Sequence, residues 1–367
     1  MLQTQTRVAD MLDDHPFLGR EVAELPTPAP LADLDALEAN IAAMADFFRP
    51  LPVRLRPHAK THRAPAVARR QIEAGAHGVT CAKVGMAEAM ADGGIDDLFV
   101  ANQIVAPQAI DRLCRLANRA MVTVAVDDAR NVAELSDAAR AHGVNLFVVI
   151  EVDAGMGRCG VQPGGPTLDL ARAVLAAEGL TFSGLHAYEG HVVQDPDPTV
   201  RRVETERMLE RHGIEVETIT CGGTGTYDVS GVYPGVTEHQ SGSYVYMDPG
   251  YREKVPAFAL AFSVLSTVMS RPTADKVITD AGVQSLANDY GTPLVKNHPE
   301  LSFAYLAEEH GQYHVRDGCQ TALDLGDRIE VHPGHCCSAA NLHDLVFAVR
   351  GGIVEEVWRA TARGKSA

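Results

Sequence analysis

Residues 121–153, MVTVAVDDARNVAELSDAARAHGVNLFVVIEVD, contain two short apolar runs with one helical segment between them. The runs Met121–Val126 and Leu146–Asp153 are rich in valine and isoleucine, as buried strands are. Residues 127–143 are alanine-rich and amphipathic, and they end in Gly143, a residue that favours helix C-termini. The order strand, helix, strand predicts a βαβ unit with two parallel strands.

The same alternation extends over most of the first 250 residues. Further apolar runs lie at 53–58, 78–81, 97–103, 182–188, 218–223 and 244–248, and further alanine-rich helical segments at 64–76, 83–94 and 165–179. Eight such runs separated by helices predict a (β/α)8 TIM-type barrel, with an open doubly wound sheet as the alternative. We expect the barrel to span residues 29–250.

The pattern changes after Tyr251. Short β-branched runs between turns lie at 262–272, 275–282, 326–336 and 345–364, with little helical periodicity. We therefore expect residues 251–367 to form a mostly β domain, and residues 1–28, which fit no barrel unit, to join it.

Composition excludes several classes of function. The 367 residues carry a net charge of −16, so the chain has no basic surplus for nucleic acid or anionic membranes. The longest apolar stretch, 255–269, is too short for a bilayer span. The N-terminal sequence does not resemble a signal peptide, so we expect a cytoplasmic protein. The seven cysteines are odd in number and scattered, which does not suggest disulfides; we expect most of Cys81, Cys114, Cys159, Cys221 and Cys319 to be buried.

Catalytic residues of a barrel lie at the C-terminal ends of its strands. Lys60 lies at such an end, between His58 and His62, in the most basic segment of an acidic chain. Arg158 and Tyr188 follow two later runs. Lys60 could be a solvated surface lysine, but neighbouring cations help to lower the pKa of an amine and keep it nucleophilic.

Glycine and hydroxyl residues follow the last two runs. They are Gly223, Thr224, Gly225 and Thr226, and then Gly242 and Ser243. Late in a barrel such loops can bind a phosphate through backbone N–H groups and hydroxyls, although a plain turn is the alternative. A phosphate site and a strand-end lysine together are what pyridoxal 5'-phosphate requires.

Near the C-terminus, His335 and Cys337 suggest a metal site. If this segment is an extended strand, positions i and i+2 face the same side, so the two side chains converge while Cys336 points away. Imidazole and thiolate suit zinc, with water or substrate completing the coordination. The alternative is a buried structural pair; His332 and His343 are weaker ligand candidates.

With these residues in place, the chain resembles the D-threonine aldolase and D-serine dehydratase family of fold-type III pyridoxal phosphate enzymes, relatives of alanine racemase. The resemblance runs from about Leu25 to Gly364 and rests on RPHAKTH, EVDAGMGRCGV, GLHAY, GGTGTYD, SGVYPGVTEHQSGSYVYMD, VLSTVMSRP, EEHG, PGHCCSAANLHD and VWRATARG. Several motifs in the same order are far more specific than any one of them.

The resemblance implies a barrel with a C-terminal β domain, working as a homodimer on a small D-amino acid. It implies that Lys60 forms the Schiff base, that Arg158 lies near the phenolic oxygen, and that Tyr188 faces the pyridine ring. The implied phosphate-binding residues are Gly223, Thr224, Gly225, Thr226, Gly242, Ser243 and Tyr244, and the implied metal ligands are His335 and Cys337.

Two departures from the family pattern bear on activity. Cys337 stands where the aldolases have aspartate, which favours zinc over manganese or magnesium and matches the dehydratases. Glu189 and His191 replace other residues in the expected pocket wall. We expect an aldolase that cleaves D-threonine-like substrates to glycine and an aldehyde. The alternatives are a D-serine-type dehydratase giving a keto acid and ammonia, a racemase, or a non-catalytic cofactor carrier.

Overall fold

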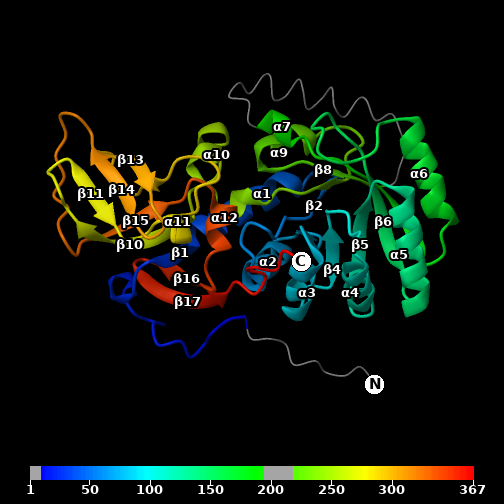
Figure 1. Ribbon diagram of the computed structural model, residues 1–367, viewed down its shortest axis with the longest axis horizontal. Coiled ribbons are helices and arrows are strands. Elements are labelled where there is room, and N and C mark those ends of the chain that lie inside the picture. Colours follow the sequence, from blue (N-terminus) through cyan, green and yellow to red (C-terminus); the bar gives the residue numbers. More distant parts are fainter. Residues whose placement is uncertain (1–9, 194–217) are drawn as a thin grey trace.

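The computed structural model describes residues 10–193 and 218–367. Two sheets lie side by side, a parallel sheet surrounded by helices and a mostly antiparallel sheet formed largely by the C-terminal third of the chain (Figure 1). Among the described residues, no helix is long and apolar enough to cross a membrane.

The first sheet has eight parallel strands. They are β2 (Arg54–Leu55), β3 (Val79–Cys81), β4 (Asp97–Val100), β5 (Met121–Val126), β6 (Leu146–Glu151), β7 (Leu180–His186), β8 (Thr218–Cys221) and β9 (Glu238–His239). Helices α2 (Pro65–Glu73), α3 (Val84–Asp92), α4 (Pro107–Ala117), α5 (Ala129–His142) and α6 (Gly165–Ala176) connect successive strands, and the short helices α7 (Gly190–Val193) and α9 (Tyr227–Ser230) follow β7 and β8. A parallel bridge between His58 and Thr80 joins the end of β2 to β3, while β2 pairs with β9. The sheet therefore closes, and the predicted (β/α)8 barrel is confirmed.

The eighth strand is not where we expected it. It is the two-residue β9, and the apolar run Tyr244–Asp248 forms instead a short 3-10 helix, η3 (Ser243–Val245), and a turn. This run is buried because helix α1 (Leu34–Phe48) packs against it, with Asn40 Nδ2 donating to the carbonyl of Val245. Helix packing, not strand pairing, therefore explains its apolar composition.

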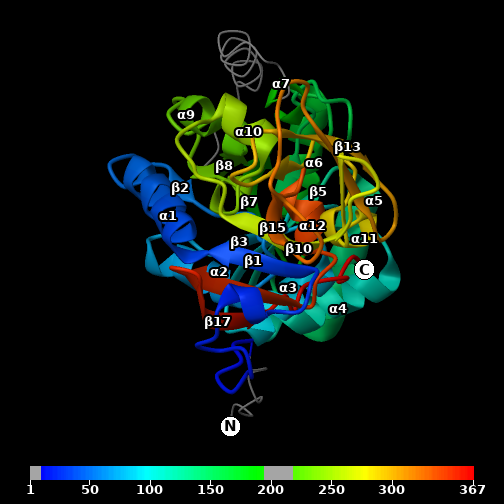
Figure 2. The same cartoon turned by 90° about the vertical axis from the view of Figure 1, so that its left-hand side faces the viewer.

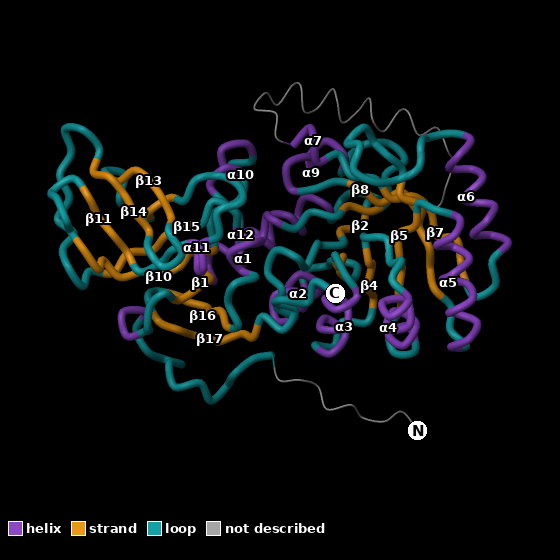
Figure 3. Tube along the Cα trace, in the orientation of Figure 1, coloured by secondary structure: helices purple, strands orange, loops and turns teal. Residues whose placement is uncertain are grey.

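The second sheet has nine strands (Figure 3). They are β1 (Ala29–Asp33), β10 (Phe262–Ser270), β11 (Lys276–Thr279), β12 (Leu294–Val295), β13 (Leu301–Leu306), β14 (Gly311–Val315), β15 (Arg328–His332), β16 (Leu345–Arg350) and β17 (Ile353–Arg359). The main path is β13-β14-β11-β10-β1-β16-β17, with β15 paired to β10 and β12. Short helices α10 (Pro249–Lys254), α11 (Val283–Leu286) and α12 (Cys336–Ala340) lie between these strands and the barrel (Figure 1). The mostly β character of the C-terminal part is confirmed.

The N-terminal segment is part of this second sheet. Strand β1, at the start of the range that we expected for the barrel, pairs with β10 and β16. Figure 2 shows β1 beside β10. Residues preceding it run along β17, where the Leu12 amide donates to the Val357 carbonyl at 3.0 Å. One apolar core then extends from α1 into β10 and β17 and includes Leu37, Val264 and Trp358. The barrel and the β sheet are therefore packed together around a shared core.

Arg56, one residue beyond β2, stabilises the closure of the barrel. Its Nε donates to Glu238 on β9 at 2.8 Å, and its Nη1 donates to Asp97 on β4 at 2.6 Å. The Arg56 side chain is only 7% exposed, so these ion pairs are largely shielded from water. Burial alone would lower the pKa of Arg56, but Glu238 and Asp97 raise it.

We predict that Arg56→Met lowers the free energy of unfolding by about 3–5 kcal/mol, because it leaves two carboxylates buried without their partner. Urea denaturation followed by circular dichroism measures this change. Arg172→Ala is the control: Arg172 pairs with Asp169 at the surface, with side chains 74% and 77% exposed, and its loss should cost less than about 0.5 kcal/mol. Equal effects of the two substitutions would contradict the role given to Arg56.

Candidate active site

A cavity of about 730 Å³ opens at the C-terminal ends of the barrel strands. Loops after seven of the eight strands contribute to its lining, and the segments around α10 and α12 close its other side. The predicted site residues in this lining are Lys60, Arg158, Tyr188, Gly223, Thr224, Gly242, Ser243, His335 and Cys337. Residues from both sheets therefore meet in one cavity.

Lys60 follows β2 and reaches into the cavity. Its backbone N–H donates to Nδ1 of His58 at 3.3 Å, which fixes the turn that carries it. Burial, together with the positive charges of Arg158 and Arg63, lowers the pKa of Lys60, although the Cys337 thiolate opposes this. A lowered pKa increases the fraction of neutral, nucleophilic amine.

Arg158 and Tyr188 lie on the opposite wall. The Arg158 guanidinium lies over the Tyr188 ring, 5.4 Å from its centroid, and approaches Glu151 on β6 at 3.6 Å. Burial and the nearby Glu189 carboxyl raise the pKa of Tyr188 to about 12, so the phenol stays neutral. The two side chains form a cationic and aromatic surface suited to a flat anionic ligand.

Two glycine positions shape the part of the cavity predicted to bind phosphate. Gly222 has φ +85°, and a Cβ there would collide with the His239 ring. A Cβ on Gly242 would lie 2.8 Å from the His58 carbonyl oxygen. Glycine therefore allows the loop after β8 to lie against β9, and the loop after β9 to lie against the loop that carries Lys60.

Three predicted phosphate-binding residues lie behind this surface. Gly225, Thr226 and Tyr244 are buried and are not part of the cavity lining. The Thr226 hydroxyl donates to Glu189 at 2.6 Å, and the Tyr244 hydroxyl accepts from Gln71 at 2.9 Å. The backbone N–H of Tyr244 donates to the Thr224 hydroxyl at 3.0 Å, so Tyr244 orients a lining residue.

The two residues expected to alter the pocket wall occupy different positions. His191 lines the cavity and is exposed, whereas Glu189 is fully buried beneath the wall. Burial raises the pKa of Glu189, and its hydrogen bond to Thr226 ties it to the loop after β8. Glu189 therefore supports the loop from behind, while His191 faces the ligand space.

His335 and Cys337 do not lie on a strand, so that prediction is wrong. His335 is the N-cap of helix α12, and Cys337 is the second residue of this helix. The two side chains nevertheless line the same two cavities, from the start of this helix, and each shifts the pKa of the other. The expected convergence is present, but it arises from a helix start rather than from strand alternation.

Cys336 is fully buried and lines neither cavity, in keeping with the expectation that it points away from the pair. Its sulfur lies 3.6 Å from Oδ2 of Asp248, the same oxygen that accepts from His335 Nδ1 at 3.1 Å. A hydrogen bond from the Cys336 thiol, helped by His335 and Lys60, holds the pKa of Cys337 well below its usual range despite burial. Burial would lower the pKa of His335, but Asp248 and Cys337 raise it to about 10. Both shifts favour a charged pair, with the Cys337 thiol deprotonated and the His335 ring protonated.

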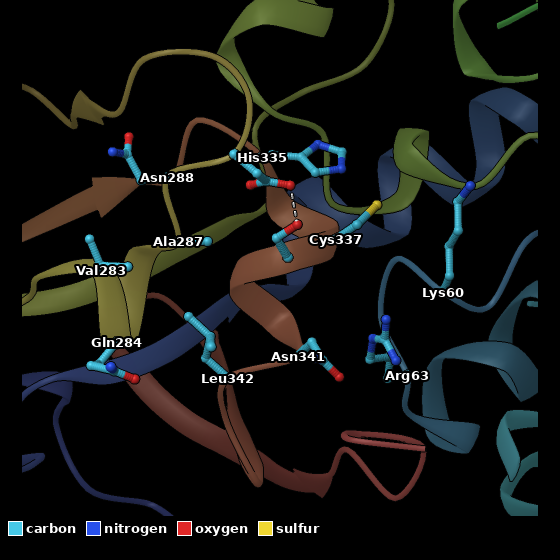
Figure 4. A pocket seen from close by; sticks show the side chains of 12 residues that line it. Lys60, Arg63, Val283, Gln284, Ala287, Asn288, His335, Cys337, Asn341 and Leu342 are labelled. Atoms are coloured by element: carbon cyan, nitrogen blue, oxygen red, sulfur yellow. Dashed lines mark hydrogen bonds between the residues drawn. The ribbon is translucent and has the colours of Figure 1, made fainter. Parts of the chain in front are cut away.

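A second cavity, of about 580 Å³, begins at the same wall (Figure 4). Lys60, His335 and Cys337 line both cavities. The weaker ligand candidates lie elsewhere, since His332 Nδ1 bonds the Phe262 carbonyl and His343 Nε2 bonds the Ser285 carbonyl, both at 2.8 Å.

Several residues of the site were missed from the sequence. Asp248 orients His335, and His186 and Gln240 line the first cavity at the ends of β7 and β9. The strand-end argument applied to Tyr188 also covers His186, two residues earlier on β7. Nothing in the sequence around Asp248 indicates its role, because its partner His335 lies 87 residues further along the chain.

All seven cysteines are free. As expected, most of the five scattered cysteines are buried, namely Cys81, Cys114 and Cys221, whereas Cys159 is partly exposed and Cys319 is exposed.

Comparisons with known proteins agree with this arrangement. Residues 32–249 match the family described as alanine racemase, N-terminal domain, and residues 261–349 match a putative serine dehydratase domain. The chain is 39% identical over 366 residues to D-threonine aldolase from an Arthrobacter species, with 95% of each chain covered. It is 38% identical over 371 residues to 3-hydroxy-D-aspartate aldolase from Paracoccus denitrificans, with 95% of this chain and 94% of the relative covered.

A more distant relative is a dehydratase. D-threo-3-hydroxyaspartate dehydratase from a Delftia species is 30% identical over 349 residues, with 86% of this chain and 91% of the relative covered. Among solved structures, D-threonine aldolase from Filomicrobium marinum matches with a TM-score of 0.92 at 38% identity, covering 95% of this chain and 99% of that chain. The greater similarity to the aldolases favours carbon–carbon lyase chemistry, and the chain belongs to the D-threonine aldolase and D-serine dehydratase family of fold-type III pyridoxal phosphate enzymes.

Proposed function

We propose that the protein is an aldolase that cleaves D-configured β-hydroxy-α-amino acids to glycine and an aldehyde, using pyridoxal phosphate and a divalent metal. One observation carries this proposal: Lys60 of the barrel and the His335–Cys337 pair of α12 line the same cavity wall. An amine-bound cofactor and a metal would thus act on adjacent carbons of one substrate.

The residues present fit the cofactor. Lys60 offers a partly desolvated amine, and Arg158 with Tyr188 offers a cationic and aromatic wall. Backbone groups of Gly223 and Gly242 and the hydroxyls of Thr224 and Ser243 line the part of the cavity suited to a phosphate. When bound, pyridoxal phosphate supplies an electron sink for negative charge at the substrate α-carbon.

The residues present also fit a metal held by two protein ligands. No group of three or more His, Cys, Asp or Glu residues is arranged for metal binding in the described ranges 10–193 and 218–367. The Asp248 carboxylate bonds Nδ1 of His335, the arrangement that carboxylates give to metal-binding histidines, so Nε2 is the ring nitrogen that would bind the metal. With the Cys337 thiolate this makes an N/S donor pair suited to zinc, whose binding would release the extra proton of His335. When bound, the metal supplies Lewis-acid chemistry that lowers the pKa of an adjacent hydroxyl.

The chain's own residues then have separable roles. The His335–Cys337 wall places the β-hydroxyl, so that losing its proton weakens the Cα–Cβ bond. Because the pKa of Lys60 is lowered, its protonated form is a stronger acid than an ordinary lysine, so Lys60 can return a proton to the α-carbon of glycine. Arg158, on the cavity wall opposite Lys60, neutralises negative charge there.

We also propose that the protein is a homodimer located in the cytoplasm. The family resemblance supports a homodimer, which analytical ultracentrifugation tests. Seven free thiols support a reducing compartment such as the cytoplasm.

A dehydratase is the second candidate, because Cys337 matches the dehydratase pattern. Product analysis decides between the two reactions. We predict that D-threonine yields glycine and acetaldehyde in equal amounts, with neither ammonia nor keto acid above background. Lys60→Ala should form neither product set and should lose the visible absorbance of the lysine-bound cofactor. A keto acid and ammonia as main products would reject the aldolase.

The adjacent cysteines provide a matched pair for the metal proposal. We predict that Cys337→Ala purifies without stoichiometric metal, because it removes one of only two protein ligands, while Cys336→Ala retains metal. Elemental analysis of both variants measures this, and the visible absorbance of the bound cofactor reports that the barrel site is intact in each. Metal retained in Cys337→Ala and lost from Cys336→Ala would show that the other thiol is the ligand.

A further inference from the structure

We propose that Arg63 binds a carboxylate on the β-substituent of the substrate, so that the enzyme prefers β-hydroxy D-amino dicarboxylic acids to D-threonine. This inference rests on the proposed aldolase function and adds the substrate class. Cleavage of 3-hydroxy-D-aspartate would break the Cα–Cβ bond and release glyoxylate. The β-hydroxyl would lose one proton, and the α-carbon of the glycine product would gain one, so the reaction balances.

The two cavities give the β-substituent its direction. The substrate α-carbon must lie near Lys60, and its β-hydroxyl must lie near His335 and Cys337. These three residues form the wall common to both cavities. Since the cofactor would occupy the first cavity, the β-substituent projects into the second, which Figure 4 shows beside the same three residues.

The lining of the second cavity is mixed. Arg63, Gln284, Asn288 and Asn341 contribute polar groups, and Val283, Ala287 and Leu342 contribute apolar ones. Asp289 is also in the lining, where its carboxylate accepts from the Ser338 hydroxyl. A cavity of about 580 Å³ is far larger than a methyl group needs. Its size and the Arg63 guanidinium in its wall favour a larger, negatively charged β-substituent.

The Arg63 guanidinium could donate hydrogen bonds to a carboxylate on the β-substituent. Its Nη1 reaches the Ala362 carbonyl at 3.4 Å, and no carboxylate in the described part of the chain forms an ion pair with it. Burial lowers the pKa of Arg63, and the Cys337 thiolate opposes this. Other shielded arginines, such as Arg56 and Arg70, are instead paired with carboxylates. An incoming carboxylate would supply the partner that Arg63 lacks.

The backbone of Arg63 is fixed in an unfavourable conformation. Its φ of +55° is in the left-handed region, which non-glycine residues rarely adopt. Two hydrogen bonds hold it there, from the Arg63 amide to the Ala59 carbonyl at 2.8 Å and from the Ala362 amide to the Arg63 carbonyl at 3.0 Å. Because both the Lys60 loop and the C-terminal segment anchor this residue, the guanidinium has a defined place in the cavity wall.

The test compares glycine release from 3-hydroxy-D-aspartate and from D-threonine by the metal-loaded holoenzyme. The wild-type protein should show the higher kcat/KM for the dicarboxylate. In Arg63→Asn, which removes the charge and tolerates the left-handed backbone, the ratio of the two kcat/KM values should fall about 10- to 100-fold, mainly through KM. Arg63→Lys is the matched control, and it should retain a preference for the dicarboxylate because it keeps the positive charge.

Three results would overturn the inference. One is a wild-type preference for D-threonine, which needs no variant to observe. Another is an equal loss on both substrates in Arg63→Asn, which would place Arg63 on the α-carboxylate common to both. The third is a fall in the thermal midpoint with an unchanged ratio, which would assign Arg63 to holding the C-terminal segment. Absence of glycine from either substrate would instead reject the aldolase function itself.

Discussion

The Asp248 carboxylate is the interaction on which the site depends. Its side chain is only 3% exposed and lies where the chain leaves the barrel for the second sheet. Oδ1 accepts from the Tyr251 amide at the start of α10, and Oδ2 accepts from His335 and lies near Cys336 at the start of α12. One buried acid thus holds the first turns of two helices against the barrel. Together with the Tyr290 ring, which packs edge-on against His335, it fixes the direction of the His335 ring.

These contacts of Asp248 explain how residues of two sheets form one reaction centre. The barrel supplies Lys60 and the cavity for the cofactor, and α12 brings a thiolate and an imidazole to the same wall. The charges are interdependent: Lys60 helps to keep Cys337 ionised, and Cys337 limits the fall in the pKa of Lys60. The core shared by α1, β10 and β17 gives this arrangement a rigid base. A small shift of α12 would move the proposed metal ligands away from the Lys60 amine. The cofactor and the metal could then no longer act on the same substrate.

Sequence reasoning predicted the parts of this account that depend on local pattern. Strand and helix alternation gave the barrel, and the strand-end rule gave Lys60, Arg158 and Tyr188. It failed where long-range packing decides structure. The run Tyr244–Asp248 has the composition of a strand because α1 covers it, while the true eighth strand has two residues and no detectable pattern. Residues 336–340, CCSAA, form too short a helix for periodicity to reveal, so His335 and Cys337 were placed near each other for the wrong reason. Asp248 and Arg63 acquire their roles only from contacts distant in sequence.

The central claim is that the cofactor-bound substrate reaches the His335–Cys337 pair. The most direct measurement is the visible spectrum of the holoenzyme with cobalt(II) in place of zinc, recorded during rapid mixing with D-threonine and, separately, with glycine. Both amino acids react with the cofactor, but only D-threonine carries a β-hydroxyl. The account predicts that D-threonine changes the cobalt bands before turnover and that glycine leaves them unchanged. Cobalt bands that respond to neither amino acid, in an enzyme that still cleaves D-threonine, would contradict it.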